Sequence, residues 1–170
     1  CTFLSDITLP TTLTSLGSNV FQNCKYLESI TLPSGLLSIG SGAFWGCIGL
    51  KSIVLPDNVA TIDVNTFRGC TALESITLPD TLKYIDEQAF ANCPSLTEII
   101  IPANVTEIKS NAFMSCSQLT RVYIKSRKVT IANYAFSNSY QRNVSLTIYA
   151  PSSVMDKISA LAYDAEYVEW

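Results

Sequence analysis

The sequence predicts a right-handed α/β solenoid of about seven coils, in which short parallel strands stack along one axis and short helical or 3₁₀ turns connect them. The first observation is the spacing of the six cysteines, which recur every 23 residues without exception. The second is that leucine, isoleucine, proline and phenylalanine columns follow the same period. Because one such unit cannot cover its own apolar face, a period of this size is typical of stacked repeats. The cysteines are Cys1, Cys24, Cys47, Cys70, Cys93 and Cys116.

Each repeat opens with a short predicted strand. In the first repeat Ile7 and Leu9 alternate with polar residues, so both apolar side chains point to the same side. Pro10 then ends the strand, because proline has no N–H to donate to the ladder. Stacking of the equivalent strands in parallel register would place neighbouring coils roughly 4.8 Å apart.

The second half of each repeat is expected to return along the opposite side. Leu13 and Leu16 predict a second short extended segment, and Gly17 stands where a turn favours a permissive residue. Lys109 occupies the same column, which argues against a strict left-handed conformation there. In most repeats an Ala-Phe turn then closes the unit, and it is too short to be a stable helix alone. The phenylalanines predict a second regular row, made of Phe21, Phe44, Phe67, Phe90, Phe113 and Phe136.

The pattern changes after residue 124. Lys125 replaces the proline, and residues 146–148 restore a strand that is one residue out of phase. The last unit of a solenoid has to close the core, so atypical sequence is expected at this end. We therefore predict that the solenoid covers residues 1–151 and that residues 152–170 form a C-terminal cap within the same domain.

The predicted cap contains a helix and a strand. Ser152 and Ser153 are suited to cap a helix from about Val154 to Tyr163. Residues 167–170 predict a short final strand, and its last residue, Trp170, is expected to seal the end of the core.

Composition narrows the possible functions. The chain has a net charge of −3 and only 15% charged residues, so neither a nucleic acid nor an anionic membrane surface is favoured as a partner. No apolar run is long enough to cross a bilayer. Histidine is absent, which removes the usual general base and the commonest transition-metal ligand. The sequence also has no clustered carboxylate pair and no phosphate-binding loop, so it predicts neither an enzyme nor a cofactor or metal site.

The cysteines admit three interpretations: disulfides, a metal site or a packed row. Side chains stacked in register point the same way, so their Cβ atoms would lie about 4.8 Å apart, beyond the ~3.5–4.5 Å of a disulfide. A linear row of thiols does not converge on one metal ion. We therefore expect reduced, buried and evenly stacked cysteines that pack as small apolar residues. Cys1 falls on the same spacing, which assigns it to the first coil and argues against a lipid anchor.

The outward positions of the strands form the candidate binding surface, because solenoids usually bind through such a face. Most of these positions hold small polar residues, and the run is interrupted toward the C-terminus. An alternative interpretation is purely structural, since β-branched residues favour strands whatever they bind and opposite charges on adjacent strands form ordinary pairs. The candidate binding residues are Thr31, Val54, Thr77, Glu98, Ile100, Arg121 and Tyr123, together with Trp45, which could pair with Arg68 on the turn side.

Charge also shifts along the chain. Residues 57–107 are mainly acidic, whereas residues 121–128 carry a band of four basic side chains. This band could meet an acidic partner or a glycan, or it could be a solvated loop. Its members are Arg121, Lys125, Arg127 and Lys128.

The repeat itself resembles a known family. Leu73-Glu-Ser-Ile-Thr-Leu-Pro79, followed by Leu82-x-x-Ile85 and Ala89-Phe90-x-x-Cys93, is similar to the BspA-type leucine-rich repeat of surface proteins from anaerobic bacteria and some protozoan parasites. The resemblance covers residues 1 to about 151. It identifies the type of repeat and does not specify a ligand.

The resemblance implies a non-enzymatic protein–protein interaction or adhesion module of a secreted or cell-surface protein. Its strand-lined face would bind proteins such as those of the host extracellular matrix, or macromolecules of neighbouring cells. Two alternatives remain open: a structural spacer that displays another domain, and a carbohydrate-binding module that uses exposed aromatic side chains.

Overall fold

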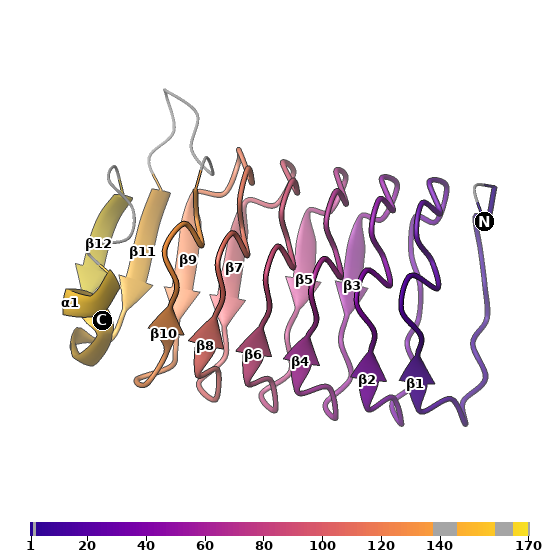
Figure 1. Ribbon diagram of the computed structural model, residues 1–170, viewed down its shortest axis with the longest axis horizontal. Helices are drawn as coiled ribbons and strands as arrows, with labels where there is room; N and C mark the ends of the chain where they lie inside the picture. Colours follow the sequence, from indigo (N-terminus) through magenta and orange to yellow (C-terminus); the bar gives the residue numbers. More distant parts are fainter. Residues whose placement is uncertain (2, 138–145, 159–164, 170) are drawn as a thin grey trace.

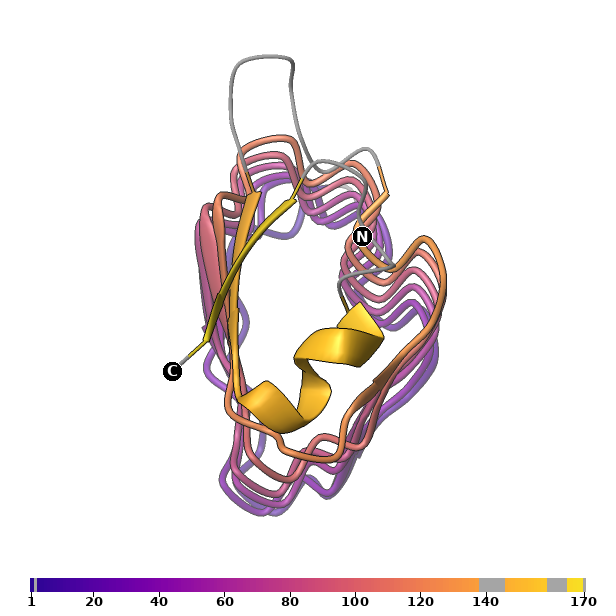
Figure 2. The same ribbon diagram turned by 90° about the vertical axis from the view of Figure 1, so that its left-hand side faces the viewer.

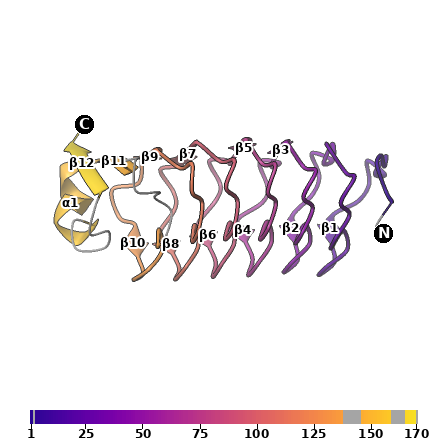
Figure 3. The ribbon, with the colours of Figure 1, turned by 90° about the horizontal axis from the view of Figure 1, so that it is seen from above.

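The computed structural model describes residues 1, 3–137, 146–158 and 165–169, and these form an elongated solenoid of about six turns built from parallel strands (Figure 1). The turns follow one another along a single axis, with the C-terminal helix and last strand at one end (Figure 3). The predicted stacking of short parallel strands is confirmed. The count of about seven coils is not confirmed.

One face carries the longer strands. Their neighbours pair in parallel, with Ile53 opposite Ile76 and Ile99 opposite Val122, an offset of one repeat each time. Ile148 pairs with Val122, so the ladder continues although the 23-residue spacing changes before β11 (Leu146–Ala150). This long-strand face consists of β3 (Ser52–Val54), β5 (Ser75–Thr77), β7 (Glu98–Ile101), β9 (Arg121–Ile124), β11 (Leu146–Ala150) and β12 (Ala165–Glu169).

The opposite face carries strands of two residues each. Their first residue points outward and their second is buried, as the Leu13-x-x-Leu16 pattern predicts for this side. This short-strand face consists of β1 (Ser15–Leu16), β2 (Ser38–Ile39), β4 (Thr61–Ile62), β6 (Tyr84–Ile85), β8 (Glu107–Ile108) and β10 (Thr130–Ile131).

The strands predicted in the first two repeats do not form a ladder. Residues 7–9 and 30–32 are not assigned to any strand. A hollow of about 690 Å³ lies between residues 29–34 and 52–58. The two coils stay in contact beside this hollow, since the N–H of Lys51 donates a hydrogen bond to the carbonyl of Glu28 at 3.0 Å. The ladder is therefore interrupted beyond that bond.

One apolar core runs through all the coils. The phenylalanine rings stack along it with centroids 5.1–5.4 Å apart and planes within 20° of parallel. Phe44, Phe67, Phe90 and Phe113 are completely buried. Offset stacking of this kind adds to the free energy gained by burying the rings.

The turns after the short strands agree with the sequence analysis at one point and differ from it at another. Neither Gly17 nor Gly40 has a positive φ angle, as Lys109 in the same column indicated. Left-handed residues lie instead two positions after Gly17, at Asn19, and again at Asn23, and the pattern recurs in later coils. A left-handed residue every fourth position cannot continue a right-handed helix. The predicted helical or 3₁₀ turn is therefore replaced by consecutive tight turns, and helix is minimal in the described residues. The two left-handed columns are Asn19, Gly42, Asn65, Gln88, Asn111 and Tyr134, and Asn23, Gly46, Gly69, Asn92 and Ser115.

Helix α1 (Ser152–Ile158) lies across the C-terminal end of the coils (Figure 2). It begins two residues before the expected start, and its Val154 is buried in the core. The hydroxyl of Ser153 donates a hydrogen bond to the carbonyl of Arg127 at 3.3 Å. The predicted helix end at Tyr163 and the predicted seal at Trp170 fall outside the described residues. In the described part of the chain, no helix has the length and apolar character needed to cross a membrane.

Candidate interaction surface

Four outward side chains at the C-terminal end of the long-strand face form one continuous row. Ile100 lies opposite Tyr123, Tyr123 opposite Tyr149, and Tyr149 opposite Val168, each pair on adjacent strands. On β7, β9 and β11 the sequence neighbours of these residues are buried in the core, because side chains alternate along a strand. We call Ile100, Tyr123, Tyr149 and Val168 the apolar row.

The apolar row remains open to solvent at its two ends. Ile100 is 47% exposed and Val168 is 39% exposed. Between them the rings of Tyr123 and Tyr149 stack with centroids 4.7 Å apart and planes 12° from parallel. The row therefore presents aliphatic and aromatic surface with a fixed geometry.

Tyr149 and Val168 were missed by the sequence analysis. The expected surface followed the strict repeat, and both residues lie after the change of phase. The alternation in Leu146-Thr-Ile-Tyr-Ala150 was the available signal, since it places Tyr149 on the outward side once Ile148 is assigned to the core.

A polar border runs beside the apolar row. Arg121 Nη2 lies 3.0 Å from Glu98 Oε2 on the neighbouring strand, and both side chains are about half exposed. Such a pair contributes little to stability in water. It supplies one positive and one negative group next to the row, which is the usual arrangement of an apolar centre with a polar rim.

The remaining candidate residues of this face do not join the row. Thr31, Val54 and Thr77 are exposed, but they lie on earlier coils. No ladder joins β5 to β7, and a hollow of about 270 Å³ lies between the two strands. The structure thus brings together Glu98, Ile100, Arg121 and Tyr123, and separates them from the other three.

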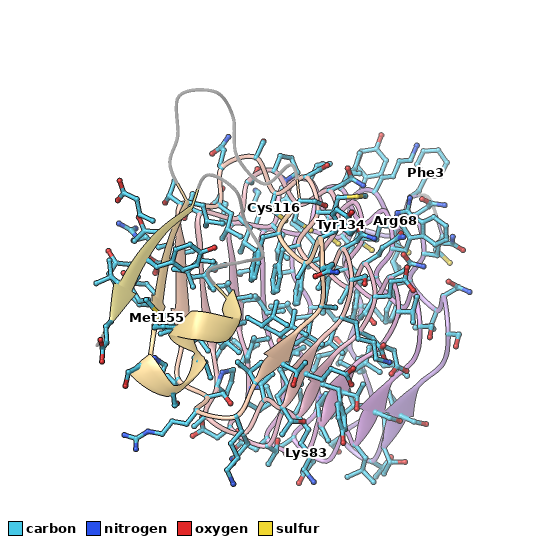
Figure 4. The ribbon with its side chains drawn as sticks, turned by 60° about the vertical axis from the view of Figure 1, so that its left-hand side comes forward. Phe3, Arg68, Lys83, Cys116, Tyr134 and Met155 are labelled. Atoms are coloured by element: carbon cyan, nitrogen blue, oxygen red, sulfur yellow. The ribbon has the colours of Figure 1, made fainter. Side chains whose placement is uncertain are left out.

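Trp45 lies in the turn segment, away from the long strands. The guanidinium of Arg68 lies 5.3 Å from the centre of its ring, as the sequence suggested. Arg68 Nη1 also donates a hydrogen bond to Gln88 Oε1 at 2.6 Å. Trp45 is half-buried, and Figure 4 shows Arg68 at the turn edge of the solenoid. One face of the indole is therefore occupied by a cation of the same chain.

The cysteine row has a hydrogen-bonding role that the sequence analysis did not foresee. Four thiols each donate a hydrogen bond to the backbone carbonyl of the phenylalanine 26 residues earlier, in the preceding coil, at 3.0–3.1 Å. The donors are Cys47, Cys70, Cys93 and Cys116. All six cysteines are free, and five of them are buried. Cys1, in the first coil, is exposed.

The environment of three buried thiols makes them unreactive. Burial, reinforced by the neighbouring Cys24, raises the pKa of the Cys47 thiol to about 12. Burial also raises the pKa of Cys70 well above its ordinary value, and a hydrogen bond with Cys116 does the same for Cys93. Because the thiolate is the nucleophile and the metal ligand, these cysteines stay protonated and unreactive near neutral pH. Across the described ranges, no group of three acidic or thiol side chains is placed to hold a metal ion.

The basic band is divided by the fold. Arg121 lies on the long-strand face, paired with Glu98. Lys125, Arg127 and Lys128 lie at the edge where the chain passes from the long strands to the short strands, at the bottom of Figure 1.

These observations define the class: stacked 23-residue coils with short parallel strands and an asparagine- and phenylalanine-rich turn form a leucine-rich-repeat solenoid. The family model described as "BspA type Leucine rich repeat region" matches residues 1–117 and 38–164, with six copies. The chain therefore belongs to the BspA-type leucine-rich-repeat family. No curated protein matches the sequence.

Solved structures of bacterial leucine-rich-repeat proteins are similar to this one. A leucine-rich repeat protein from Bacteroides ovatus is 26% identical with a TM-score of 0.65, and the match covers 100% of this chain and 50% of that one. The leucine-rich repeat protein of T. pallidum is 25% identical with a TM-score of 0.68, over 95% of this chain and 85% of that one. A leucine-rich cell surface protein from Faecalibacterium prausnitzii, at 23% identity and a TM-score of 0.53, shares the fold over 93% of this chain and 56% of its own. The chain thus spans about half the length of the first and third of these proteins.

Proposed function

We propose that this chain is a non-enzymatic protein-interaction module of a secreted or cell-surface protein and that it acts in adhesion. Its membership of the BspA-type family supports this proposal. The similar F. prausnitzii protein, described as a cell surface protein, supports the location. We also propose that residues 152–170 close the C-terminal end of the solenoid as part of one domain.

The observation that carries the proposal is the apolar row. Rigid aromatic side chains with an apolar body and a polar tip are enriched at protein interfaces, where they lose little conformational entropy on binding. The two stacked tyrosines meet this description, and Ile100 and Val168 extend the surface on either side. The ion pair between Glu98 and Arg121 supplies part of a polar rim. The partner expected from this chemistry is a protein surface with an apolar centre and charges of both signs at its border.

The test compares two equivalent substitutions on the same face. Ile100→Asp places a charge in the apolar row, whereas Val54→Asp places it at the same repeat position beyond the break between β5 and β7. Val54 is 64% exposed, so the control is at least as accessible as the test position. Binding to immobilised fibronectin and fibrinogen and to epithelial cells is measured by surface plasmon resonance and cell attachment.

We expect Ile100→Asp to weaken binding by about tenfold or more, as substitution of a central interface residue does, and Val54→Asp to leave it unchanged. Thermal unfolding of both variants shows that the fold is retained. Equal losses in the two variants would contradict the role of the apolar row. Absence of binding to all three targets would favour a structural spacer.

A carbohydrate-binding module is the weaker alternative at Trp45. Sugar rings stack on a free aromatic face, and Arg68 already lies over this indole. A second surface, on a different edge of the solenoid, has chemistry better suited to a charged sugar.

A further inference from the structure

A basic hollow lies at the edge where the long strands lead into the short ones. Its volume is about 910 Å³, and residues from four successive coils line it. Figure 4 shows Lys83 at this lower edge, on the side opposite Arg68 and Tyr134. The lining residues that matter for its chemistry are Lys83, Tyr84, Asn104, Lys125, Arg127 and Lys128.

Positive charge is concentrated here in a protein that is negative overall. Four of the 11 basic residues line the hollow, while the net charge of the chain is −3. All four are exposed, and none forms an ion pair within the part of the chain that the structure describes. By contrast, three cations outside the hollow are paired: Lys51 with Glu28, Lys109 with Asp86 and Arg121 with Glu98.

Acidic groups lie near only part of the hollow. Glu107 is in register with Tyr84 on the neighbouring strand and is half-buried. Lys125 also lines the adjacent hollow between β5 and β7, together with three acidic residues, so its charge is partly offset. Lys83, Arg127 and Lys128 are therefore the cations most available to an anionic ligand. The three acidic residues are Glu74, Asp80 and Glu98.

The segment that carries two of these cations is held in place by a buried serine. Ser126 is 1% exposed, and its hydroxyl donates to the carbonyl of Val105 at 2.6 Å and accepts from the N–H of Lys128 at 3.3 Å. The carbonyl of Arg127 accepts from Ser153 of α1. Because this backbone is fixed before any ligand arrives, less conformational entropy is lost on binding.

The uncharged lining residues point to a ligand with hydroxyl groups. Asn104, Thr81 and Thr106 each donate one side-chain hydrogen bond to a backbone carbonyl of the preceding coil. Their oxygen atoms remain as acceptors at the hollow. Tyr84 is 41% exposed and lines the same hollow, which offers a ring face to an apolar side of a sugar.

We propose that this hollow binds a segment of an acidic polysaccharide, with sulfate or carboxylate groups on Lys83, Arg127 and Lys128 and a sugar ring against Tyr84. Its volume lies toward the upper end of the roughly 300–1,000 Å³ range of ligand sites, which exceeds a single small anion and suits a short oligosaccharide. A nucleic acid would need more than one aromatic side chain on which to stack successive bases. An acidic peptide would use the cations but would leave the exposed ring face of Tyr84 uncovered.

The experiment measures binding of defined oligosaccharides by isothermal titration calorimetry at about 0.05 and 0.15 M salt. A heparin-derived tetrasaccharide and a tetragalacturonate distinguish sulfate from carboxylate recognition, and cellotetraose is the neutral control. A glutamate hexapeptide and a thymidine oligonucleotide represent the two other classes of polyanion.

Two triple variants of equal charge test the site. Lys83→Ala/Arg127→Ala/Lys128→Ala removes three cations of the hollow, and Lys25→Ala/Lys51→Ala/Lys109→Ala removes three cations elsewhere, so each changes the net charge from −3 to −6. We expect the first to weaken binding of at least one acidic tetrasaccharide by about tenfold and the second to leave it nearly unchanged, since only charges close to the ligand escape screening by salt. Tyr84→Ala should weaken saccharide binding more than Tyr84→Phe does.

Three results would overturn the proposal. These are equal losses in the two triple variants, tighter binding of the peptide or the oligonucleotide than of either acidic saccharide, and no binding of any acidic saccharide. The substitutions leave the apolar row untouched, so this proposal can fail while protein binding through the long-strand face persists, and the reverse is also possible.

Discussion

Substitution of Phe67 by alanine tests whether the stacked rings hold neighbouring coils together. Phe67 is completely buried and lies between Phe44 and Phe90, with ring centroids 5.4 Å away on both sides. Loss of the buried ring removes about 2–3 kcal/mol of transfer free energy, and loss of two ring contacts removes about 0.5–1.5 kcal/mol each. We therefore expect Phe67→Ala to lower the free energy of unfolding by about 3–6 kcal/mol, a range that includes the roughly 3–5 kcal/mol typical of replacing a buried phenylalanine by alanine.

Two comparison variants separate burial from stacking. Phe67→Leu keeps most of the apolar burial and loses both ring contacts, so it should cost about 1–3 kcal/mol. Phe21 is also buried but stacks on one ring, Phe44, so Phe21→Ala should cost about 1 kcal/mol less than Phe67→Ala. Urea unfolding followed by circular dichroism gives the three values, provided that the slope of the transition is unchanged. Equal costs at Phe21 and Phe67 would refute the additive contribution of a second ring.

Two further predictions concern the thiols and the left-handed turns. At pH 8 a maleimide should label Cys1 alone in the folded protein, and labelling of Cys47 or Cys70 would contradict their burial. Folding raises the pKa of the Cys47 thiol from 9.0 to about 12. The contribution of this thiol to stability is therefore complete below pH 9 and is lost as the pH rises toward 12. The urea concentration at the unfolding midpoint should fall across this pH range, and it should fall less in Cys47→Ala. Gly69 has a φ of 72°, and a Cβ atom at this position would meet nothing closer than 3.8 Å, so steric crowding is not expected there. Gly69→Ala should therefore cost about 1–2 kcal/mol for conformation alone, whereas Gly69→Asn should cost less; equal costs in thermal unfolding would argue against this explanation.

Positions with the same side chain in every repeat could be predicted from the sequence. The apolar columns and the parallel register followed from the 23-residue period, because identical side chains one period apart have to meet when coils stack. The left-handed columns were not predicted, since asparagine, glycine, glutamine, serine and tyrosine share them and no single residue type marks the position.

The surfaces were harder to predict than the core. Tyr149 was missed because the phase changes before β11, and a strict repeat places a different residue opposite Tyr123. Lys83 was not grouped with Lys125, Arg127 and Lys128 because it lies in an earlier, mainly acidic part of the sequence. Only the stacking of coils brings it to the same edge. A surface formed by residues two coils apart cannot be predicted from the sequence pattern of a single repeat.

The bond from each thiol to the phenylalanine carbonyl of the preceding coil has a consequence for how such chains change length. Every bond of this kind joins one coil to the next and none reaches further. Loss or duplication of one whole repeat in the gene, such as the segment 25–47, would give each remaining thiol an equivalent acceptor without any compensating substitution. Such a change would alter the length of the solenoid by roughly 4.8 Å for each repeat, and it would leave the residues of the apolar row and of the basic hollow in place.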